Sequence, residues 1–263
     1  MLLSPSMDSL TTPVRDLMAT PVVAMGIEDD LEKADALLRL HRISAILVVG
    51  RDGSPAGVIS RRDLLRAGAG GRVALELPAM AAADLMSKPV ITVTAGTSIA
   101  AACRELALRR IHRVFVLEGG RPAGVFSTRE ALATVAAERI AQPIGDFIGP
   151  DVIAVETTTP LGETLAILAR AGIGGAVVLD GTMPVGLFTE REALEAAGRP
   201  ASTPTEDVMT QALLCLPMRT PLFRAAGFAL ATTARRIVVT DHHHAKGVLT
   251  GLDFAAFLAR PRM

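Results

Sequence analysis

A hydroxyl side chain is followed three residues later by a carboxylate at four places in the chain. The pairs are Ser60 with Asp63, Ser127 with Glu130, Thr189 with Glu192, and Thr250 with Asp253. A hydroxyl at this spacing can cap the N-terminus of a helix, and a carboxylate in the first turn suits the helix dipole. The free N–H groups at the same place can also hold a phosphate. The spacing therefore leaves both a structural cap and a ligand site open.

The four pairs belong to an internal repeat. Each follows a glycine in a short apolar segment, and each is preceded by a second landmark: RDLM, ADLM, GDFI or EDVM. The landmark aspartate precedes the turn glycine by 40 or 41 residues in every unit: Asp16 to Gly57, Asp84 to Gly124, Asp146 to Gly186, and Asp207 to Gly247. This constant spacing indicates four copies of one structural unit. We expect the Met or Ile that ends each landmark to pack a linker against the core.

The hydrophobic period changes in the same order within each unit. In the second unit a short strand at 90–93 precedes a helix at 97–110, capped by Thr97 or Ser98. Thr159-Pro160 and Thr220-Pro221 predict a cap followed by proline in the other half of the chain. Buried strands, each continuing through a hairpin into a second strand and helix, are expected at 46–49, 114–117, 176–179 and 237–240. The predicted unit is β-α-β-β-α, of the α/β (α+β) class.

Composition limits the class of protein. The chain has 263 residues, half of them hydrophobic, and its 27 basic and 27 acidic residues give zero formal net charge. This balance argues against a broad surface for nucleic acid or acidic membranes. The N-terminus does not read as a leader, and no long uncharged apolar stretch occurs. We expect a cytoplasmic protein whose Cys103 and Cys215 are inert packing residues rather than a disulfide.

The chain offers no recognisable catalytic motif. It lacks a nucleophile elbow, an HExxH zinc motif and a phosphate-binding GxxxxGK[ST] loop, so we do not expect an enzyme.

Three consecutive histidines suggest a metal sensor as another interpretation: His242, His243 and His244. Adjacent side chains in a loop rarely converge on one ion, and the repeat register places these three in a hairpin loop. We therefore predict a solvated loop there and no metal site.

Several motifs together resemble the CBS (cystathionine-β-synthase) domain family. They are the DLM landmark, the capped strand and helix, the RIHRVFV run at 110–116, and the GVIS turn that leads to Asp63. The resemblance implies four CBS repeats paired into two Bateman modules with pseudo-two-fold symmetry. The first module is predicted at residues 10–137, with repeats at about 14–68 and 82–137, and the second at 138–263, with repeats at about 144–198 and 205–260.

The resemblance also implies a ligand. In this family the clefts between paired repeats typically bind adenine nucleotides, with the turn hydroxyl near phosphate and the aspartate on the ribose. Ser60 with Asp63, and Thr250 with Asp253, match these roles. A carboxylate can accept hydrogen bonds from two adjacent sugar hydroxyls. The expected ligand is AMP, ADP, ATP or a related adenosine compound, with no obligatory cofactor.

Two of the four turns depart from this pattern because glutamate replaces aspartate. The extra methylene moves the carboxylate, so ribose binding is less strongly predicted at these turns. The residues concerned are Ser127 with Glu130, and Thr189 with Glu192.

The segments before two of the central strands add cations. His112 and Arg113 resemble the phosphate-facing pair in the γ subunit of AMP-activated protein kinase, and Arg236 takes the place of Arg113 in the fourth unit. The first and third units carry no cation there. In the family that the chain resembles, a cleft can combine the aspartate of one repeat with a cation from its partner, which predicts a cleft that joins Asp63 to Arg113. Arg113 could instead be a solvated residue or form an ion pair between repeats.

Two function classes follow. The first is a regulatory, energy-sensing module that binds an adenosine ligand and changes its contacts with an unidentified regulated protein. The second is a structural or oligomerisation scaffold with empty clefts, favoured by the two glutamate substitutions, by Gly174-Gly175, and by Phe115, Phe126 and Phe188 near the clefts. Two modules could close into a disc within one chain, or the chain could form a homodimer. Phe254, Phe257 and Leu258 give the C-terminal helix an apolar stripe for such packing.

Overall fold

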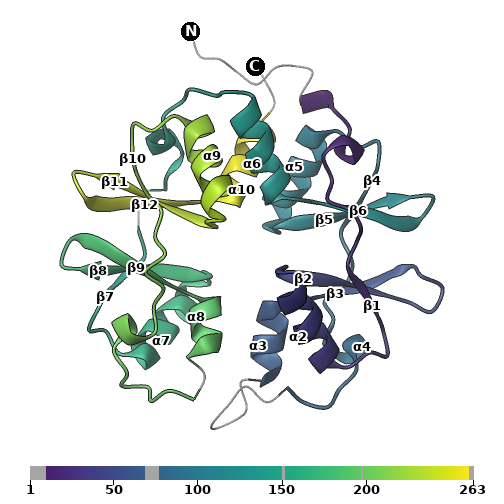
Figure 1. The fold of residues 1–263 in the computed structure, drawn as a ribbon, viewed down its shortest axis with the longest axis horizontal. Helices are drawn as coiled ribbons and strands as arrows, with labels where there is room; N and C mark the ends of the chain where they lie inside the picture. The colour runs from purple at the N-terminus through teal and green to yellow at the C-terminus, as the bar shows by residue number, and fades with distance from the viewer. Residues whose placement is uncertain (1–9, 69–76, 150–151, 197, 261–263) are drawn as a thin grey trace.

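The computed structural model describes residues 10–68, 77–149, 152–196 and 198–260. Residues 1–9, on which the expectation about a leader rests, and residues 261–263, which end the second predicted module, lie outside these ranges. The described residues form four three-stranded sheets, each with its own helices (Figure 1). In every sheet the first strand runs parallel to the second, and the second runs antiparallel to the third.

Each repeat has the predicted β-α-β-β-α order. Repeat 1 comprises β1 (Ala24–Gly26), α2 (Leu31–Leu40), β2 (Ala45–Val49), β3 (Pro55–Ser60) and α3 (Arg61–Gly68). Repeat 2 comprises β4 (Thr92–Thr94), α5 (Ile99–Arg109), β5 (Arg113–Glu118), β6 (Arg121–Ser127) and α6 (Thr128–Ala137). Repeat 3 comprises β7 (Ala154–Glu156), α7 (Leu161–Ala171), β8 (Gly175–Asp180), β9 (Met183–Thr189) and α8 (Glu190–Glu195). Repeat 4 comprises β10 (Cys215–Pro217), α9 (Leu222–Thr232), β11 (Arg236–Asp241), β12 (His244–Thr250) and α10 (Gly251–Leu258).

The four landmarks form short helical turns ahead of these units. They are η1 (Val14–Asp16), α4 (Ala82–Leu85), η2 (Ile144–Phe147) and η3 (Thr205–Asp207). Their last residues pack as expected, but on the partner repeat. A Cβ on Gly247 in repeat 4 would lie 2.5 Å from Cβ of Ile148, which precedes repeat 3. The same exchange places Met86 on Gly57, Met18 on Gly124 and Met209 on Gly186. Only glycine leaves room for this approach, so the turn glycine and the landmark residue tie the two repeats of a pair together.

The first helix of repeat 2 begins as predicted. Ser98 is its N-cap, and its Oγ accepts a hydrogen bond from Ala101 N at 3.3 Å. Thr97 serves the preceding turn, where its Oγ1 accepts from Thr94 N at 3.1 Å. The cap residue is therefore the second of the two candidates.

The threonine caps predicted for α7 and α9 are wrong. Pro160 and Pro221 are themselves the N-cap residues and hold extended backbone angles, and neither makes a side-chain cap hydrogen bond. Thr159 instead accepts from Glu156 N at 3.0 Å in the preceding turn. Proline has a fixed φ and no N–H, so it can start a helix without losing a donor.

The helices of repeats 2 and 4 share one hydrophobic core. Helix α6 packs against α9, and α10 packs against both α5 and α6, as Figure 1 shows. Phe254 and Leu258 of α10 are buried in this core, with Phe257 partly buried beside them. The apolar stripe predicted on the C-terminal helix thus joins the two halves of the chain. The ribbons of α3 and α8, in repeats 1 and 3, stand apart in the same view.

Two of the three phenylalanines named for the scaffold interpretation, Phe126 and Phe188, lie in helix-covered cores rather than in clefts. Phe126 and Phe188 are fully buried in the helix-covered cores of their own repeats. Phe115 is also buried, but its strand neighbours Val114 and Val116 face the helix-covered core. Side chains alternate along a strand, so Phe115 faces the opposite side of the sheet.

Two smaller expectations have mixed outcomes. Cys103 is buried as predicted, whereas Cys215 is exposed, so its assignment as a core packing residue is wrong. His242 and His243 form the predicted hairpin turn between β11 and β12, both with positive φ.

Among the described helices, none has the length and apolar character needed to cross a membrane.

Candidate functional site

Strand pairing brings the predicted site residues of each repeat side by side. The start of each central strand lies opposite the cap hydroxyl at the end of the next strand. These pairs are Ala45 with Ser60, Arg113 with Ser127, Gly175 with Thr189, and Arg236 with Thr250. Residues that the repeat aligns in the sequence therefore occupy equivalent positions in the four sheets.

Each cap carboxylate bonds to its own cap residue. In repeat 1, Ser60 N donates to Asp63 Oδ2 at 2.8 Å and Ser60 Oγ donates to the same oxygen at 2.6 Å. The corresponding bonds join Ser127 to Glu130, Thr189 to Glu192, and Thr250 to Asp253. In return each hydroxyl accepts a backbone N–H at the start of its helix, from Asp63 N, Arg129 N, Arg191 N and Leu252 N in repeats 1 to 4. The hydroxyls therefore cap their helices at all four turns, as the structural interpretation predicts. The bonds that Asp63 accepts from Ser60 use only its Oδ2.

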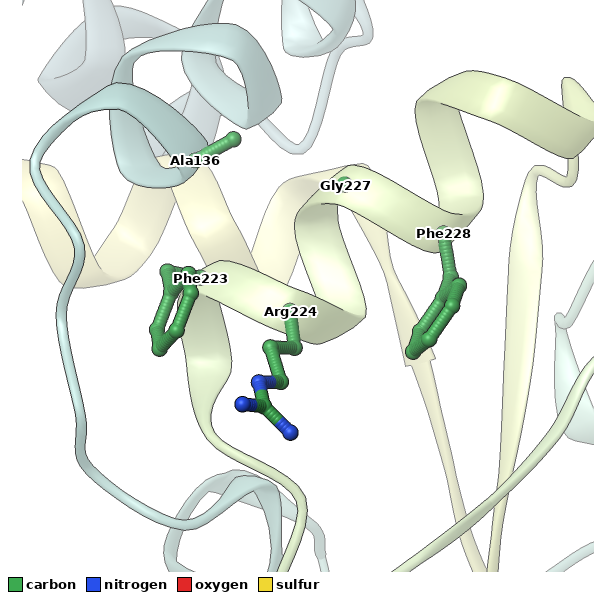
Figure 2. Close-up of a pocket in the computed structure, with 5 residues that line it drawn as sticks. All are labelled: Ala136, Phe223, Arg224, Gly227 and Phe228. Carbon is green, nitrogen blue, oxygen red and sulfur yellow. The ribbon is translucent and has the colours of Figure 1, made fainter.

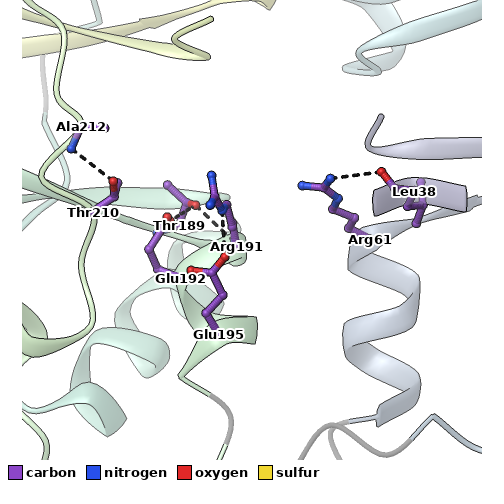
Figure 3. A network of polar contacts seen from close by, with 8 residues as sticks. All are labelled: Leu38, Arg61, Thr189, Arg191, Glu192, Glu195, Thr210 and Ala212. Carbon is purple, nitrogen blue, oxygen red and sulfur yellow. Dashed lines mark hydrogen bonds and ion pairs between the residues drawn. The ribbon is translucent and has the colours of Figure 1, made fainter. Parts of the chain in front are cut away.

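One of the two glutamates, Glu192, differs in accessibility from the other three carboxylates. Glu192 is buried, with 5% of its surface exposed, and it is engaged by Thr189 (Figure 3). Asp63, Asp253 and Glu130 are half-buried. The extra methylene therefore does not prevent capping, but in repeat 3 it accompanies a carboxylate that is withdrawn from solvent.

Arg113 reaches from repeat 2 into repeat 1. Its Nη1 donates to Ala45 O at 3.1 Å, and its Nη2 donates to Ser44 Oγ. Ala45 is the strand partner of Ser60, which holds Asp63. Among the described residues no hydrogen bond or ion pair joins Asp63 to Arg113 directly. Their joint binding of one ligand stays a prediction, although Arg113 reaches Ala45, which lies opposite the Ser60 that Asp63 binds.

Arg236 makes the matching contact in the other half of the chain. Its Nη2 donates to Gly174 O at 2.6 Å, and Gly174 occupies in repeat 3 the position of Ser44 in repeat 1. In both pairs the arginine of the later repeat therefore binds the backbone of the earlier one. This arrangement supports the predicted equivalence of Arg113 and Arg236.

Five arginines form what we call the central arginine cluster: Arg61, Arg62, Arg113, Arg235 and Arg236. Burial lowers the pKa of Arg113 to about 10, with Arg235 and Arg61 adding to this effect and Glu130 opposing it. Burial also lowers the pKa of Arg235, reinforced by Arg61, Arg236 and Arg191. Arginine stays charged at neutral pH, so these groups repel one another and favour an incoming anion.

His112 stands beside this cluster. Desolvation lowers the pKa of its imidazole, and Arg113, Arg236, Arg235 and Arg62 lower it further. The neutral form is therefore favoured, and the ring can both donate and accept a hydrogen bond. The prediction that His112 and Arg113 together face a phosphate stays a prediction.

Sequence reasoning missed Arg61, Arg62 and Glu190 as residues of this region. Arg62 forms an ion pair with Glu190 that joins repeats 1 and 3. Arg61 donates to Leu38 O at 3.4 Å and lies across from Thr189 and Glu192 in Figure 3. All three residues lie between a cap hydroxyl and its carboxylate, so their position in the repeat could have drawn attention to them. The ion pair of Arg62 with Glu190, however, depends on which repeats face each other, and the sequence of one repeat does not show that.

A surface groove lies elsewhere, on the outer side of α6 and α9 (Figure 2). Its lining is Ala136, Phe223, Arg224, Gly227 and Phe228. Ala136 is in the last turn of α6, whereas Ser127 caps the start of that helix. At 1.5 Å per residue the groove and the cap are about 13 Å apart along the helix. The groove is lined mainly by apolar residues and includes none of the predicted site residues.

Comparison with known proteins places these repeats in a family. Over 178 residues the chain is 24% identical to an uncharacterised 33.4 kDa protein from Thermofilum pendens, covering 63% of this chain and 58% of that protein. Over 118 residues it is 30% identical to inosine-5'-monophosphate dehydrogenase from Mycobacterium bovis, covering 44% of this chain and 21% of the enzyme. The chain thus spans less than two thirds of either relative.

The fold of nearly the whole chain has a solved counterpart. Protein MJ1225 from Methanocaldococcus jannaschii, a proposed archaeal homologue of γ-AMPK, superposes with a TM-score of 0.81 at 15% identity. The superposition covers 94% of this chain and all of that one. The CBS domain sequence profile matches residues 14–70, 82–137 and 144–199, more than half of the chain, and repeat 4 has the same element order. The chain therefore belongs to the CBS domain family.

Proposed function

We propose that the chain is a non-catalytic regulatory module that binds an adenine nucleotide between repeats 1 and 2. The ligand is AMP, ADP, ATP or a related adenosine compound. The observation that carries this proposal is the reach of Arg113 to Ser44 and Ala45, beside the strand end that bears Ser60 and Asp63. This contact supports a site in which a carboxylate from repeat 1 binds the ribose and a cation from repeat 2 binds the phosphate.

The roles follow from the chemistry of the groups. Asp63 has a second carboxylate oxygen beyond its cap bonds, which can accept from the ribose hydroxyls. Arg113 can pair with phosphate in the fork geometry that guanidinium favours. The N–H groups at the start of α3 add donors for the same phosphate. Repulsion within the central arginine cluster favours the anion further.

In repeats 3 and 4, an aspartate from one repeat does not meet an arginine from its partner in the way that we propose for Asp63 and Arg113. Asp253 of repeat 4 faces a partner repeat with Gly175 at the cation position. Arg236 faces the turn of repeat 3, whose carboxylate is the buried Glu192. Among the described turns, Asp63 with Arg113 is the pair that combines aspartate and arginine. We therefore expect one strong nucleotide site per chain.

A ligand in this cleft would contact two repeats at once. Ligand binding shifts a conformational equilibrium only by its differential affinity for the two states. Contacts to Asp63 from one repeat and Arg113 from the other would favour a single arrangement of the pair. The regulated partner would then respond to that arrangement.

Calorimetric titration of AMP, ADP, ATP and S-adenosylmethionine into nucleotide-free protein tests the proposal. We expect saturable binding that weakens at least tenfold in Asp63→Asn, because the neutral amide accepts poorly from the ribose yet can still cap α3. Asp35→Asn removes a partly exposed carboxylate of α2 and should leave the affinity unchanged. Silence from every ligand in folded protein would contradict the proposal and favour the scaffold function.

A further inference from the structure

The two halves of the chain differ in charge at one equivalent position. The residue directly after the cap hydroxyl is Arg61 in repeat 1 and Glu190 in repeat 3. The equivalence is fixed by strand register, since Ser60 opposes Ala45 and Thr189 opposes Gly175. A cation beside the first cleft is thus replaced by an anion beside the second.

Glu190 lies among cations from two other repeats. It pairs with Arg62 of repeat 1, and it adjoins Arg236 of repeat 4. A Cβ on Gly174 would lie 3.0 Å from Arg236 Nη2, 3.4 Å from Glu190 Oε1 and 3.5 Å from Arg62 Nη2. Three charged side chains therefore converge on one glycine, where Glu190 pairs with Arg62 and acts on Arg236 through space.

The electrostatic setting of the two equivalent arginines differs accordingly. Burial lowers the pKa of Arg236, but Glu190 and Glu192 are the largest opposing influences. Arg113, in contrast, has Arg235 as the largest influence after burial, and this neighbour repels it. The positive charge of Arg236 is thus compensated within the protein, whereas that of Arg113 is compensated less.

We propose that Glu190 is an internal counter-ion that takes the place of a ligand phosphate at Arg236, so that phosphate-bearing ligands bind strongly only between repeats 1 and 2. A carboxylate pairs with guanidinium much as a phosphate does, and the two anions would compete for the same donors. This inference rests on the proposed function for the identity of the first site. It assigns Glu190 as the residue that determines how many sites the chain has.

The test uses inorganic tripolyphosphate and AMP, titrated calorimetrically into the full chain. The variants are Glu190→Gln, which keeps the shape of the side chain, and Glu195→Gln, which removes an exposed charge from the same helix. We expect Glu190→Gln to gain a second anion site or to bind tripolyphosphate at least tenfold more tightly at that site. Glu195→Gln should behave like the wild type.

A second substitution locates the new site. Adding Arg236→Gln to Glu190→Gln should remove the gained site and leave the original one. Tripolyphosphate binding that is the same in Glu190→Gln as in the wild type would overturn the inference, as would a new site that survives Arg236→Gln. Because tripolyphosphate carries no adenosine, failure of AMP to bind would count against the proposed function alone.

Discussion

Arg113 carries its charge in surroundings that disfavour it. Burial, followed by Arg235 and Arg61, lowers the pKa of its guanidinium to about 10, yet the group stays charged at neutral pH. Its protein partners are a carbonyl and a hydroxyl rather than a carboxylate. Glu130 compensates this charge in part, and a bound anion would compensate it further.

The pH dependence of stability can be predicted at His112. Desolvation and the neighbouring arginines lower its pKa in the folded state, so the unfolded chain binds more protons at mildly acidic pH. The resulting stabilisation is present above the unfolded pKa of about 6.5 and is lost as pH falls below it. We expect the melting temperature of the wild type to fall more steeply from about pH 7.5 to about pH 5.5 than that of His112→Asn. Circular dichroism melts can follow this, and parallel slopes would show that His112 contributes nothing.

At the scale of the elements, the landmark residue of one repeat packs on the turn glycine of its partner, so that glycine should not tolerate a larger residue. In Gly247→Ala the new methyl would collide with the stiff β-branched side chain of Ile148. We expect a loss of about 1–3 kcal/mol in the free energy of unfolding, measured by urea titration with circular dichroism. Adding Ile148→Ala should make the glycine substitution less costly, and purely additive effects would contradict the contact.

A glycine with open space provides the matched control. Gly227 lies inside α9, and a Cβ there would meet nothing within 4 Å. Gly227→Ala should stabilise the protein by about 0.5–1 kcal/mol, because glycine loses more backbone freedom in a helix. Destabilisation at both positions would mean that backbone conformation, rather than the Ile148 contact, determines the result.

The elements that depend on local pattern could be predicted from the sequence, whereas their partnerships could not. The central strands, the caps at Ser60 and Ser98, and the hairpin at His242 follow from periodicity and turn chemistry. The exchange of Ile148 onto Gly247 and the pairing of Arg62 with Glu190 join segments that are distant in sequence. Such contacts depend on how repeats face one another, and a single repeat carries no signal for that.

At the scale of the molecule, repeats 2 and 4 hold the two halves together through one core. Helix α10 contributes Phe254, which is 1% exposed, to a core built mainly from α5, α6 and α9. This packing within one chain supports closure of the two modules into a disc. The ion pair between Arg62 and Glu190 adds a polar link between repeats 1 and 3.

Removing the Phe254 ring should therefore destabilise the chain as a whole. We expect Phe254→Ala to cost about 3–5 kcal/mol in the free energy of unfolding, with one cooperative transition in urea. Phe228→Ala is the matched control, because its ring is 48% exposed on α9 and should cost far less. Similar losses for both would argue against the shared core as the main link.

The most direct test of the proposed cleft compares AMP with adenosine, titrated in parallel into the wild type, Asp63→Asn and Arg113→Gln. If Asp63 binds the ribose and Arg113 the phosphate, Asp63→Asn weakens both ligands. Arg113→Gln should then lower the affinity for AMP to nearly that for adenosine and leave adenosine binding unchanged. Equal effects of Arg113→Gln on the two ligands, or no effect on either, would contradict a cleft built from these two repeats.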